Sequence, residues 1–216
     1  RETIELPEIQ TQMMRELKKA GKPLVYVNFS GSAIALEREA QLCDAILQAW
    51  YPGQAGGEAI ASVLFGDYNP AGRLPVTFYK NTAQLPDFEE YSMKGRTYRY
   101  MTEEPLFPFG YGLSYSTFSY GEARLSASKM QKGTTLSLIV PVSNTSQLDG
   151  EEVVQLYLCY PEDKEGPVKA LRAFKRVAIG KGATQEVKFD LSDNDFDRLD
   201  PSTNSMRPRS GAYRRP

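Results

Sequence analysis

The chain has 216 residues, of which 41% are hydrophobic, enough for one large domain or two ordinary domains with packed cores. Lys and Arg total 26 against 27 Asp and Glu, so the net charge of −1 gives no general attraction to nucleic acid or an anionic membrane, and neither is expected as a partner. Histidine is absent, which excludes Ser-His-Asp and Cys-His catalytic sets and the commonest zinc sites, so any catalysis would depend on carboxylates.

The first third of the chain alternates helix-like and strand-like patterns. Residues 6–20 are amphipathic, with Ile9, Met13, Leu17 and Ala20 at helical spacing, and are expected to form a surface helix. The elements expected next are a strand at 24–29 (LVYVNF), a helix at 37–45, a strand at 45–50 (AILQAW) and a helix at 58–64. This order favours a parallel sheet covered by helices.

From residue 66 to residue 115 the periodicity gives way to Pro, Gly and aromatic residues. A segment of this length without regular structure is typical of a functional or interdomain loop. Its many Tyr and Phe residues argue against a disordered linker, because disorder is poor in aromatics.

After residue 118 the pattern changes to period two. Apolar residues alternate with polar ones around Leu136 and Leu138, around Val154 and Leu156, and around Phe189 and Leu191, and we expect these six to face a core. Turn signals lie at 132–133, 148–150 and 180–182. The pattern predicts an antiparallel sandwich at 119–216, following an α/β domain with its connector at 1–118.

The loop YPGQAGGEAIASVLFG superficially resembles a phosphate-binding loop, because Gly53, Gly56 and Gly57 precede a helix. The spacing is neither GxGxxG nor GxxxxGK[ST], and Glu58 already complements the helix dipole. We interpret it as a tight strand-to-helix turn.

Three acid pairs suggest a glycosidase, since glycoside hydrolysis uses two carboxyl groups about 5–5.5 Å apart for retention and wider for inversion. The pairs are Glu89-Glu90, Glu103-Glu104 and Glu151-Glu152. Neighbours in a strand point to opposite faces, so Glu151-Glu152 is expected to be a solvated edge, and no pair identifies a catalytic acid.

The segments GRTYRYM and PLFPFGYGLSY concentrate aromatic side chains, which with Arg could form a sugar-stacking subsite. The residues are Tyr98, Tyr100, Phe107, Phe109, Tyr111 and Tyr115, with Phe118 just beyond. Pro105, Pro108, Gly110 and Gly112 are more typical of a rigid connector, so we favour interdomain packing for these rings.

The two cysteines support neither redox nor metal chemistry. Cys43 and Cys159 are far apart and neither has a CxxC partner, so we expect two buried free thiols that are not bonded to each other, and no cofactor. The sequence has no run of about eighteen apolar residues and opens with RETIELPEIQ, so an export signal, if the parent has one, is not expected here.

Three stretches carry a family resemblance. WYPGQAGGEAIASVLFGDYNPAGRLPVTFY, then GRTYRYM, then PLFPFGYGLSYSTFSY resemble, in order and spacing, the end of the α/β-sandwich domain of family 3 glycoside hydrolases, which act with retention on β-glucosides and β-xylosides. LRAFKRVAI before GKGATQEVKFDL is similar to the fibronectin type III-like domain that many members append. GRTYRY is most similar to the xylosidase-type branch.

The resemblance implies a partial α/β sandwich, a mostly parallel sheet with helices, followed by an all-β fibronectin type III-like sandwich. It also implies an upstream (β/α)8 barrel that carries the nucleophilic Asp, a β-linked sugar substrate, and a periplasmic or secreted parent. Nothing in the chain matches the barrel, and the family's acid/base Glu lies upstream of the matched stretch, so we assign no catalytic, cofactor or metal residue. The alternatives to a piece of an exo-acting β-glycosidase are a carbohydrate-binding module and a purely structural or interaction domain pair.

Overall fold

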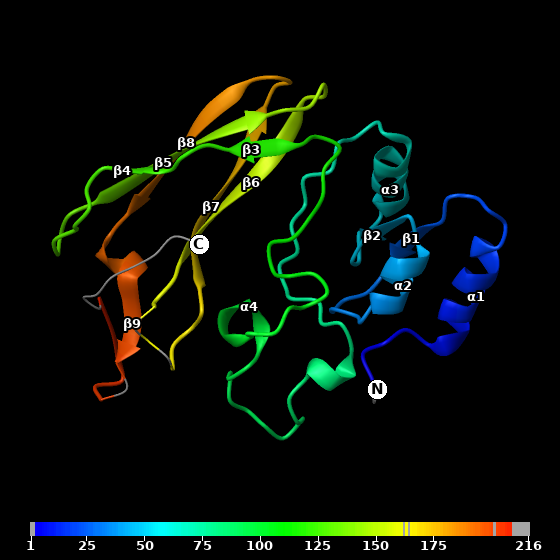
Figure 1. Ribbon diagram of the computed structural model, residues 1–216, viewed down its shortest axis with the longest axis horizontal. Helices are drawn as coiled ribbons and strands as arrows, with labels where there is room; N and C mark the ends of the chain where they lie inside the picture. The colour runs from blue at the N-terminus through cyan, green and yellow to red at the C-terminus, as the bar shows by residue number, and fades with distance from the viewer. Residues whose placement is uncertain (1–2, 162, 164, 201, 209–216) are drawn as a thin grey trace. The chain divides into compact units, whose positions relative to one another are not determined.

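The computed structural model describes residues 3–161, 163, 165–200 and 202–208, and the chain divides into two compact units (Figure 1). Unit 1 takes up Arg1–Tyr68 and Arg73–Tyr111, and unit 2 takes up Asn69–Gly72 and Gly112–Pro216.

Unit 1 has the expected order of helix, strand, helix, strand and helix. Its elements are α1 (Glu8–Lys18), β1 (Val25–Asn28), α2 (Glu37–Leu42), β2 (Ala45–Gln48) and α3 (Gly56–Phe65), then η1 (Thr82–Gln84) and α4 (Thr97–Tyr100). β1 and β2 pair in parallel, with Val25 opposite Ala45 and Asn28 opposite Gln48. The predicted order is therefore confirmed, with bounds that differ by a few residues at most ends.

The core of unit 1 lies between these elements and the chain that follows α3. Its buried residues are Leu6, Met14, Ile34, Leu36 and Phe78. Helix α1 lies where a surface helix was predicted, but the side that it buries is not the apolar stripe of the sequence pattern. Thr11 and Met14 are buried, whereas Ile9, Met13 and Leu17, the apolar stripe of the sequence pattern, are exposed.

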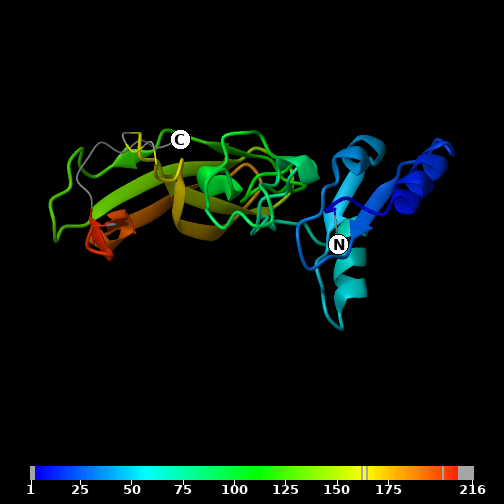
Figure 2. The ribbon, with the colours of Figure 1, turned by 90° about the horizontal axis from the view of Figure 1, so that it is seen from below.

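Unit 2 is built from antiparallel strands. They are β3 (Phe118–Tyr120), β4 (Arg124–Leu125), β5 (Leu136–Asn144), β6 (Gly150–Leu158), β7 (Ala170–Ile179), β8 (Thr184–Leu191), β9 (Asp197–Asp200) and β10 (Ser205–Pro208), with the short helix η2 (Asp193–Phe196) before β9. β5 pairs with β3, β4 and β8, while β6 pairs with β7 and β9 with β10. The view from below shows the long strands of this unit, green to orange, curved and twisted as sheets of L-residues are (Figure 2).

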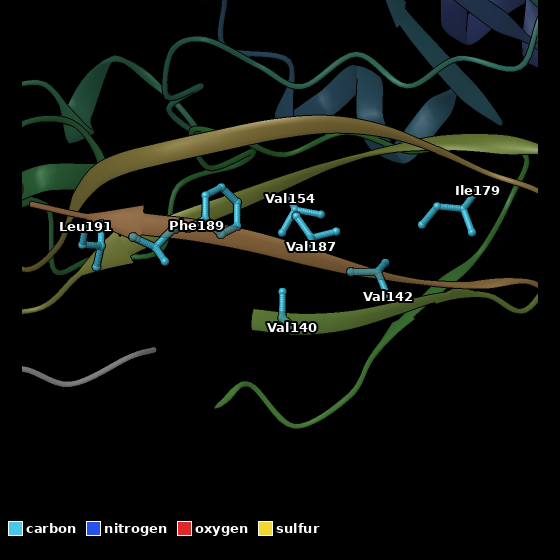
Figure 3. Packing of buried hydrophobic residues seen from close by; sticks show 8 residues of the cluster. Val140, Val142, Val154, Ile179, Val187, Phe189 and Leu191 are labelled. Carbon is cyan, nitrogen blue, oxygen red and sulfur yellow. The ribbon is translucent and has the colours of Figure 1, made fainter. Parts of the chain in front are cut away.

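The core of unit 2 lies between the strands β5 and β8 and the strands β6 and β7 (Figure 3). Four of the six predicted core residues are buried: Val154, Leu156, Phe189 and Leu191. Leu136 and Leu138 are partly buried and pack against the same cluster. The cluster also contains Val140, Val142, Val187 and Ile179. The period-two prediction is confirmed, because alternate residues of β5, β6 and β8 point to one side.

One buried amide ties the end of β5 to neighbouring chain. The Asn144 side chain donates from Nδ2 to the carbonyls of Leu148 (2.8 Å) and Ile179 (2.9 Å). Its Oδ1 accepts from the backbone N–H and the hydroxyl of Ser146. Buried carbonyls that lose such donors cost free energy, so this residue fixes the turn between β5 and β6.

A charged pair lies largely inside unit 2, where Arg198 contacts the carboxylate of Asp163 and also covers the ring of Tyr160, 4.5 Å from its centroid. Burial raises the pKa of Asp163, but the charge of Arg198, its hydrogen bond and the backbone donors of Gly166 and Glu165 outweigh burial and hold the pKa below its usual range.

Cys43 and Cys159 are both free, as expected, although each is half-buried rather than buried. Burial, followed by the nearby charge of Glu39, raises the pKa of the Cys43 thiol, which favours the neutral form. No helix in the described ranges is long and apolar enough to cross a bilayer.

Candidate functional site

The segments PVTFY and PLFPFGY, which come from two of the sequence motifs, lie beside each other in unit 1. The Phe78 N–H donates to the carbonyl of Phe107 (2.9 Å), and the Phe107 N–H donates back to Phe78 (3.1 Å). Further along, the Leu74 N–H donates to Tyr111 and the Gly110 N–H donates to Leu74, both at 2.8 Å. This antiparallel pairing fixes the aromatic segment against the chain that follows α3.

The rings of these segments pack on one another. Phe78 is fully buried and meets Trp50 edge-on, with centroids 6.1 Å apart, and Phe107 in a tilted contact at 6.4 Å. Phe107 stacks on Tyr111 at 5.2 Å. Such contacts contribute about 0.5–1.5 kcal/mol each beyond area burial. Phe78, Trp50 and Phe107 thus form part of the core of unit 1 rather than an open sugar platform. Tyr111, which stacks on Phe107, is 38% exposed.

The last four residues of the GRTYRY motif form α4, and the backbone of Thr97, the first residue of this helix, is strained. Thr97 has φ of +57°, a left-handed backbone conformation that is rare for a β-branched residue. The Thr97 N–H donates to the Tyr79 hydroxyl (3.0 Å), and the Tyr98 N–H donates to the hydroxyl of buried Thr77 (3.1 Å). Neighbouring side chains therefore hold this turn in its strained conformation.

The expected aromatic set divides between different surroundings. Tyr98 stacks on Phe109 with centroids 4.3 Å apart, while the ring of Tyr100 lies beside the guanidinium of Arg99 at 5.8 Å. Tyr115 is half-exposed. Phe118 belongs to unit 2, where it begins β3 and packs against the core.

Two other aromatic residues, not singled out in the sequence, are the most exposed rings of the described chain. Phe88 is 92% exposed and Tyr91 is 88% exposed, on a loop that Arg96 organises by donating to the carbonyls of Glu90 and Ser92. In the sequence, Phe88 and Tyr91 lie among the acidic residues Asp87, Glu89 and Glu90, and this pattern was the available signal for their exposure.

The first two acid pairs are exposed, and one carboxylate of each pair accepts a hydrogen bond from a nearby residue. Glu90 accepts from the Ser92 N–H (2.7 Å), and this hydrogen bond, aided by the Ser92 hydroxyl, lowers the pKa of Glu90. Gln84 reaches Glu103 and the Glu104 carbonyl. Glu90 and Glu103 thus take part in local loop structure.

The interpretation of Glu151-Glu152 as a solvated edge is wrong for one member. Glu151 pairs with Arg176 near the surface, but Glu152 is 7% exposed and accepts a hydrogen bond from the Tyr120 hydroxyl (2.8 Å). Because β6 buries alternate residues, the phase that buries Val154 also turns Glu152 inward.

A second buried carboxylate, Glu39 in α2, was missed. It is 1% exposed and accepts from the Thr11 hydroxyl of α1. Burial, then the charge of Glu39, raises the pKa of the neighbouring Tyr26 hydroxyl. A glutamate in a short helix normally faces solvent, so periodicity contains no signal for this residue.

The glycine loop is a turn. The Gly56 N–H donates to the Gly53 carbonyl (3.2 Å), and Gly53 has φ of +73°. A Cβ on Gly56 would lie 2.4 Å from Cγ of Pro52, so close packing explains the glycine there. In the described part of the chain no three His, Cys, Asp or Glu side chains cluster as metal ligands do.

The chain thus consists of an α/β unit that carries this aromatic segment, followed in the sequence by a unit of antiparallel strands. Residues 1–115 match the glycosyl hydrolase family 3 C-terminal domain, and residues 152–214 match the fibronectin type III-like domain. The chain therefore belongs to glycoside hydrolase family 3.

Relatives and solved structures agree with this assignment. The chain is 53% identical over 213 residues to a xylan 1,4-beta-xylosidase of Xylanibacter ruminicola, covering 99% of this chain and 24% of that protein. It is 40% identical to a periplasmic beta-glucosidase of Salmonella typhimurium, covering 88% and 27% respectively. The beta-glucosidase of Listeria innocua in complex with isofagomine superposes with a TM-score of 0.84 at 32% identity, covering 98% of this chain and 31% of that one. The chain thus spans about a quarter of the length of these curated relatives.

Proposed function

We propose that the chain is the C-terminal portion of a retaining, exo-acting β-glycosidase that hydrolyses β-xylosides or β-glucosides. The observation that supports this most is the 53% identity across nearly the whole chain to a protein named as a xylan 1,4-beta-xylosidase. The similarity of the GRTYRY motif to the xylosidase-type branch of the family favours β-xylosides over β-glucosides.

The catalytic carboxylates belong to the parent enzyme outside residues 1–216. Retaining hydrolysis needs a nucleophile and an acid/base at about 5–5.5 Å, and we assign neither role to a residue of this chain. The proposed partners are an upstream (β/α)8 barrel, which supplies the nucleophilic Asp, and the β-linked sugar bound there. The packed aromatic core of unit 1 is consistent with a supporting role for this portion.

The same proposal extends to architecture and location. Unit 1 is the end of an α/β sandwich whose sheet is mostly parallel, and the parallel pairing of β1 with β2 supports this. The fibronectin type III-like domain begins at residue 119, next to the start of β3 at Phe118. The parent is periplasmic or secreted, by analogy with the relative named as a periplasmic beta-glucosidase.

The experiment is an assay of the full-length enzyme on aryl β-xylosides and aryl β-glucosides, with NMR following the anomer first released. We expect single sugars from nonreducing ends with retained configuration, and faster turnover of the xylosides. An inverting or inactive full-length enzyme would contradict the proposed reaction. Preference for glucosides would remove only the xylosidase assignment.

A further inference from the structure

Helix α1 has an apolar side that the described chain leaves open. Ile9, Met13 and Leu17 follow one another at intervals of four residues and are 70%, 55% and 52% exposed. Residues four apart lie on the same side of a helix, so the three side chains form one stripe. Figures 1 and 2 both show α1 at the outer flank of unit 1, beside α2.

A different side of α1 makes the contacts within unit 1. Thr11 and Met14 are buried there, and Thr11 donates to Glu39 of α2. Met13 and Met14 are adjacent in sequence and yet are 55% and 3% exposed. Helix α1 therefore carries apolar side chains over a larger part of its circumference than unit 1 covers.

The exposed stripe borders a shallow hollow. Its lining is Ile9, Gln10, Gln12, Met13 and Glu16, all from α1. No other element of the described chain contributes to its wall, so the hollow belongs to the exposed surface of α1.

We propose that the Ile9–Met13–Leu17 stripe is a docking surface, and that its occupant is an apolar surface of the polypeptide N-terminal to residue 1 in the full-length enzyme. The inference rests on the proposed function insofar as that enzyme is a multidomain glycosidase. The inference adds to the proposed function the residues through which residues 1–216 contact the remainder of the full-length enzyme.

The length of the relatives identifies the occupant. The chain covers only 24% and 27% of the first two relatives and matches a C-terminal domain, so most of a family 3 enzyme precedes it. Helix α1 is the first helix of the chain and leads into β1, which pairs in parallel with β2 alone among the described strands. Parallel sheets have covered faces and are larger than two strands, so further structure is expected beside α1.

The charges on and next to α1 disfavour a lipid surface. Its basic residues are paired with acids, Arg15 with Glu8, Lys18 with Asp44 and Lys19 with Glu16. A membrane-binding helix instead presents free Lys and Arg beside its apolar side.

The size of the stripe disfavours a second copy of the chain. An 11-residue helix is about 16 Å long and roughly 10 Å wide, whereas a stable dimer buries about 800 Å² on each partner. The stripe suits a contact within one polypeptide, which the chain connection already holds together.

Methionine oxidation tests the proposal, with Met14 as the internal control. Residues 1–216 and the full-length enzyme are treated with hydrogen peroxide alongside free N-acetylmethionine, and each methionine is followed by peptide mass spectrometry. In residues 1–216 we expect Met13 to oxidise at least about tenfold faster than Met14, because susceptibility follows exposure. In the full-length enzyme Met13 should slow to within about threefold of Met14.

A variant gives a second, independent readout. Met13→Lys should leave the thermal midpoint of residues 1–216 unchanged within about 1 °C, because Met13 is exposed there, and should lower that of the full-length enzyme by about 2–4 °C or more. Equal Met13 oxidation rates in the two proteins, or equal effects of the variant, would overturn the proposal. Met13 protection that disappears on dilution would assign the stripe to a second copy and overturn it too.

Activity in the same full-length sample separates the two proposals. An active β-glycosidase with reactive Met13 contradicts the docking surface and leaves the proposed function standing. An inactive protein with protected Met13 contradicts the proposed function and supports the docking surface.

Discussion

Two adjacent glycines at the start of α3 provide a test in which the same substitution should have opposite effects. A Cβ added to Gly56 would lie 2.4 Å from Cγ and 2.8 Å from Cβ of Pro52, whereas a Cβ added to Gly57 would meet nothing within 4 Å. Both residues lie in α3, where alanine is favoured over glycine. Gly56→Ala and Gly57→Ala therefore differ in packing alone.

The expected free energies follow from these distances. Carbon atoms in contact are about 3.5–4.0 Å apart, so Gly56→Ala requires a shift of about 1 Å against a rigid proline ring. Overpacking of this kind costs about 1–3 kcal/mol, which exceeds the gain in helix propensity of up to about 1 kcal/mol. Gly56→Ala should destabilise the chain by roughly 1–2 kcal/mol, and Gly57→Ala should stabilise it by about 0.5–1 kcal/mol.

Thermal and urea unfolding followed by the fluorescence of Trp50 suits this test, since Trp50 is the only tryptophan and lies in unit 1. For a chain of this size, 1 kcal/mol corresponds to about 2–4 °C in Tm. The midpoints of the two variants should therefore lie several degrees apart, on either side of the parent. Equal midpoints would refute the close packing of Gly56 on Pro52.

Three further substitutions or conditions test unit 2. Leu156→Ala should reduce the free energy of unfolding by about 2–5 kcal/mol in urea, and an unchanged midpoint would disprove its place in the core. The pKa of Asp163 is held below its usual range, so its contribution to the free energy of unfolding is fully present above about pH 4 and is lost as the pH falls through the lowered pKa. Arg198→Ala should flatten this decline when Tm is measured against pH in the acid range. An unaltered slope would count against the Arg198–Asp163 pair. Asn144→Asp replaces the donor to the buried Ile179 carbonyl and to the part-buried Leu148 carbonyl, and should cost roughly 2–5 kcal/mol at neutral pH. Asn194→Asp, at an exposed position, is the control and should stay within about 0.5 kcal/mol; equal losses would contradict the hydrogen bonding of Asn144.

Periodicity predicted the order of elements in unit 1 and the core side of the strands in unit 2. It succeeded for Val154 and Leu156 because a strand has two sides and apolar residues identify the buried one. It identified α1 as a helix but not which side its own unit covers, since Thr11 is buried while Ile9 is exposed. That choice depends on chain outside the helix, which a local pattern does not contain.

Charge misled the interpretation of one residue that the pattern could have placed. Glu152 is in phase with Val154, and the alternation predicts it inside, but its charge favoured the surface. Glu39 had no such signal, because its burial depends on the contact between α1 and α2. The packing of Phe107 against the core likewise follows from pairing with Phe78, some 30 positions earlier in the chain.

The measurement that tests the central claim most directly is the activity of purified residues 1–216 on aryl β-xylosides and aryl β-glucosides, after circular dichroism has verified that the chain is folded. We expect no turnover above the uncatalysed rate, because without a nucleophile no glycosyl-enzyme intermediate forms, and removing catalytic groups typically costs several orders of magnitude in rate. Hydrolysis of either glycoside by the pure, folded chain would show that a catalytic pair lies among its own carboxylates and would contradict the account.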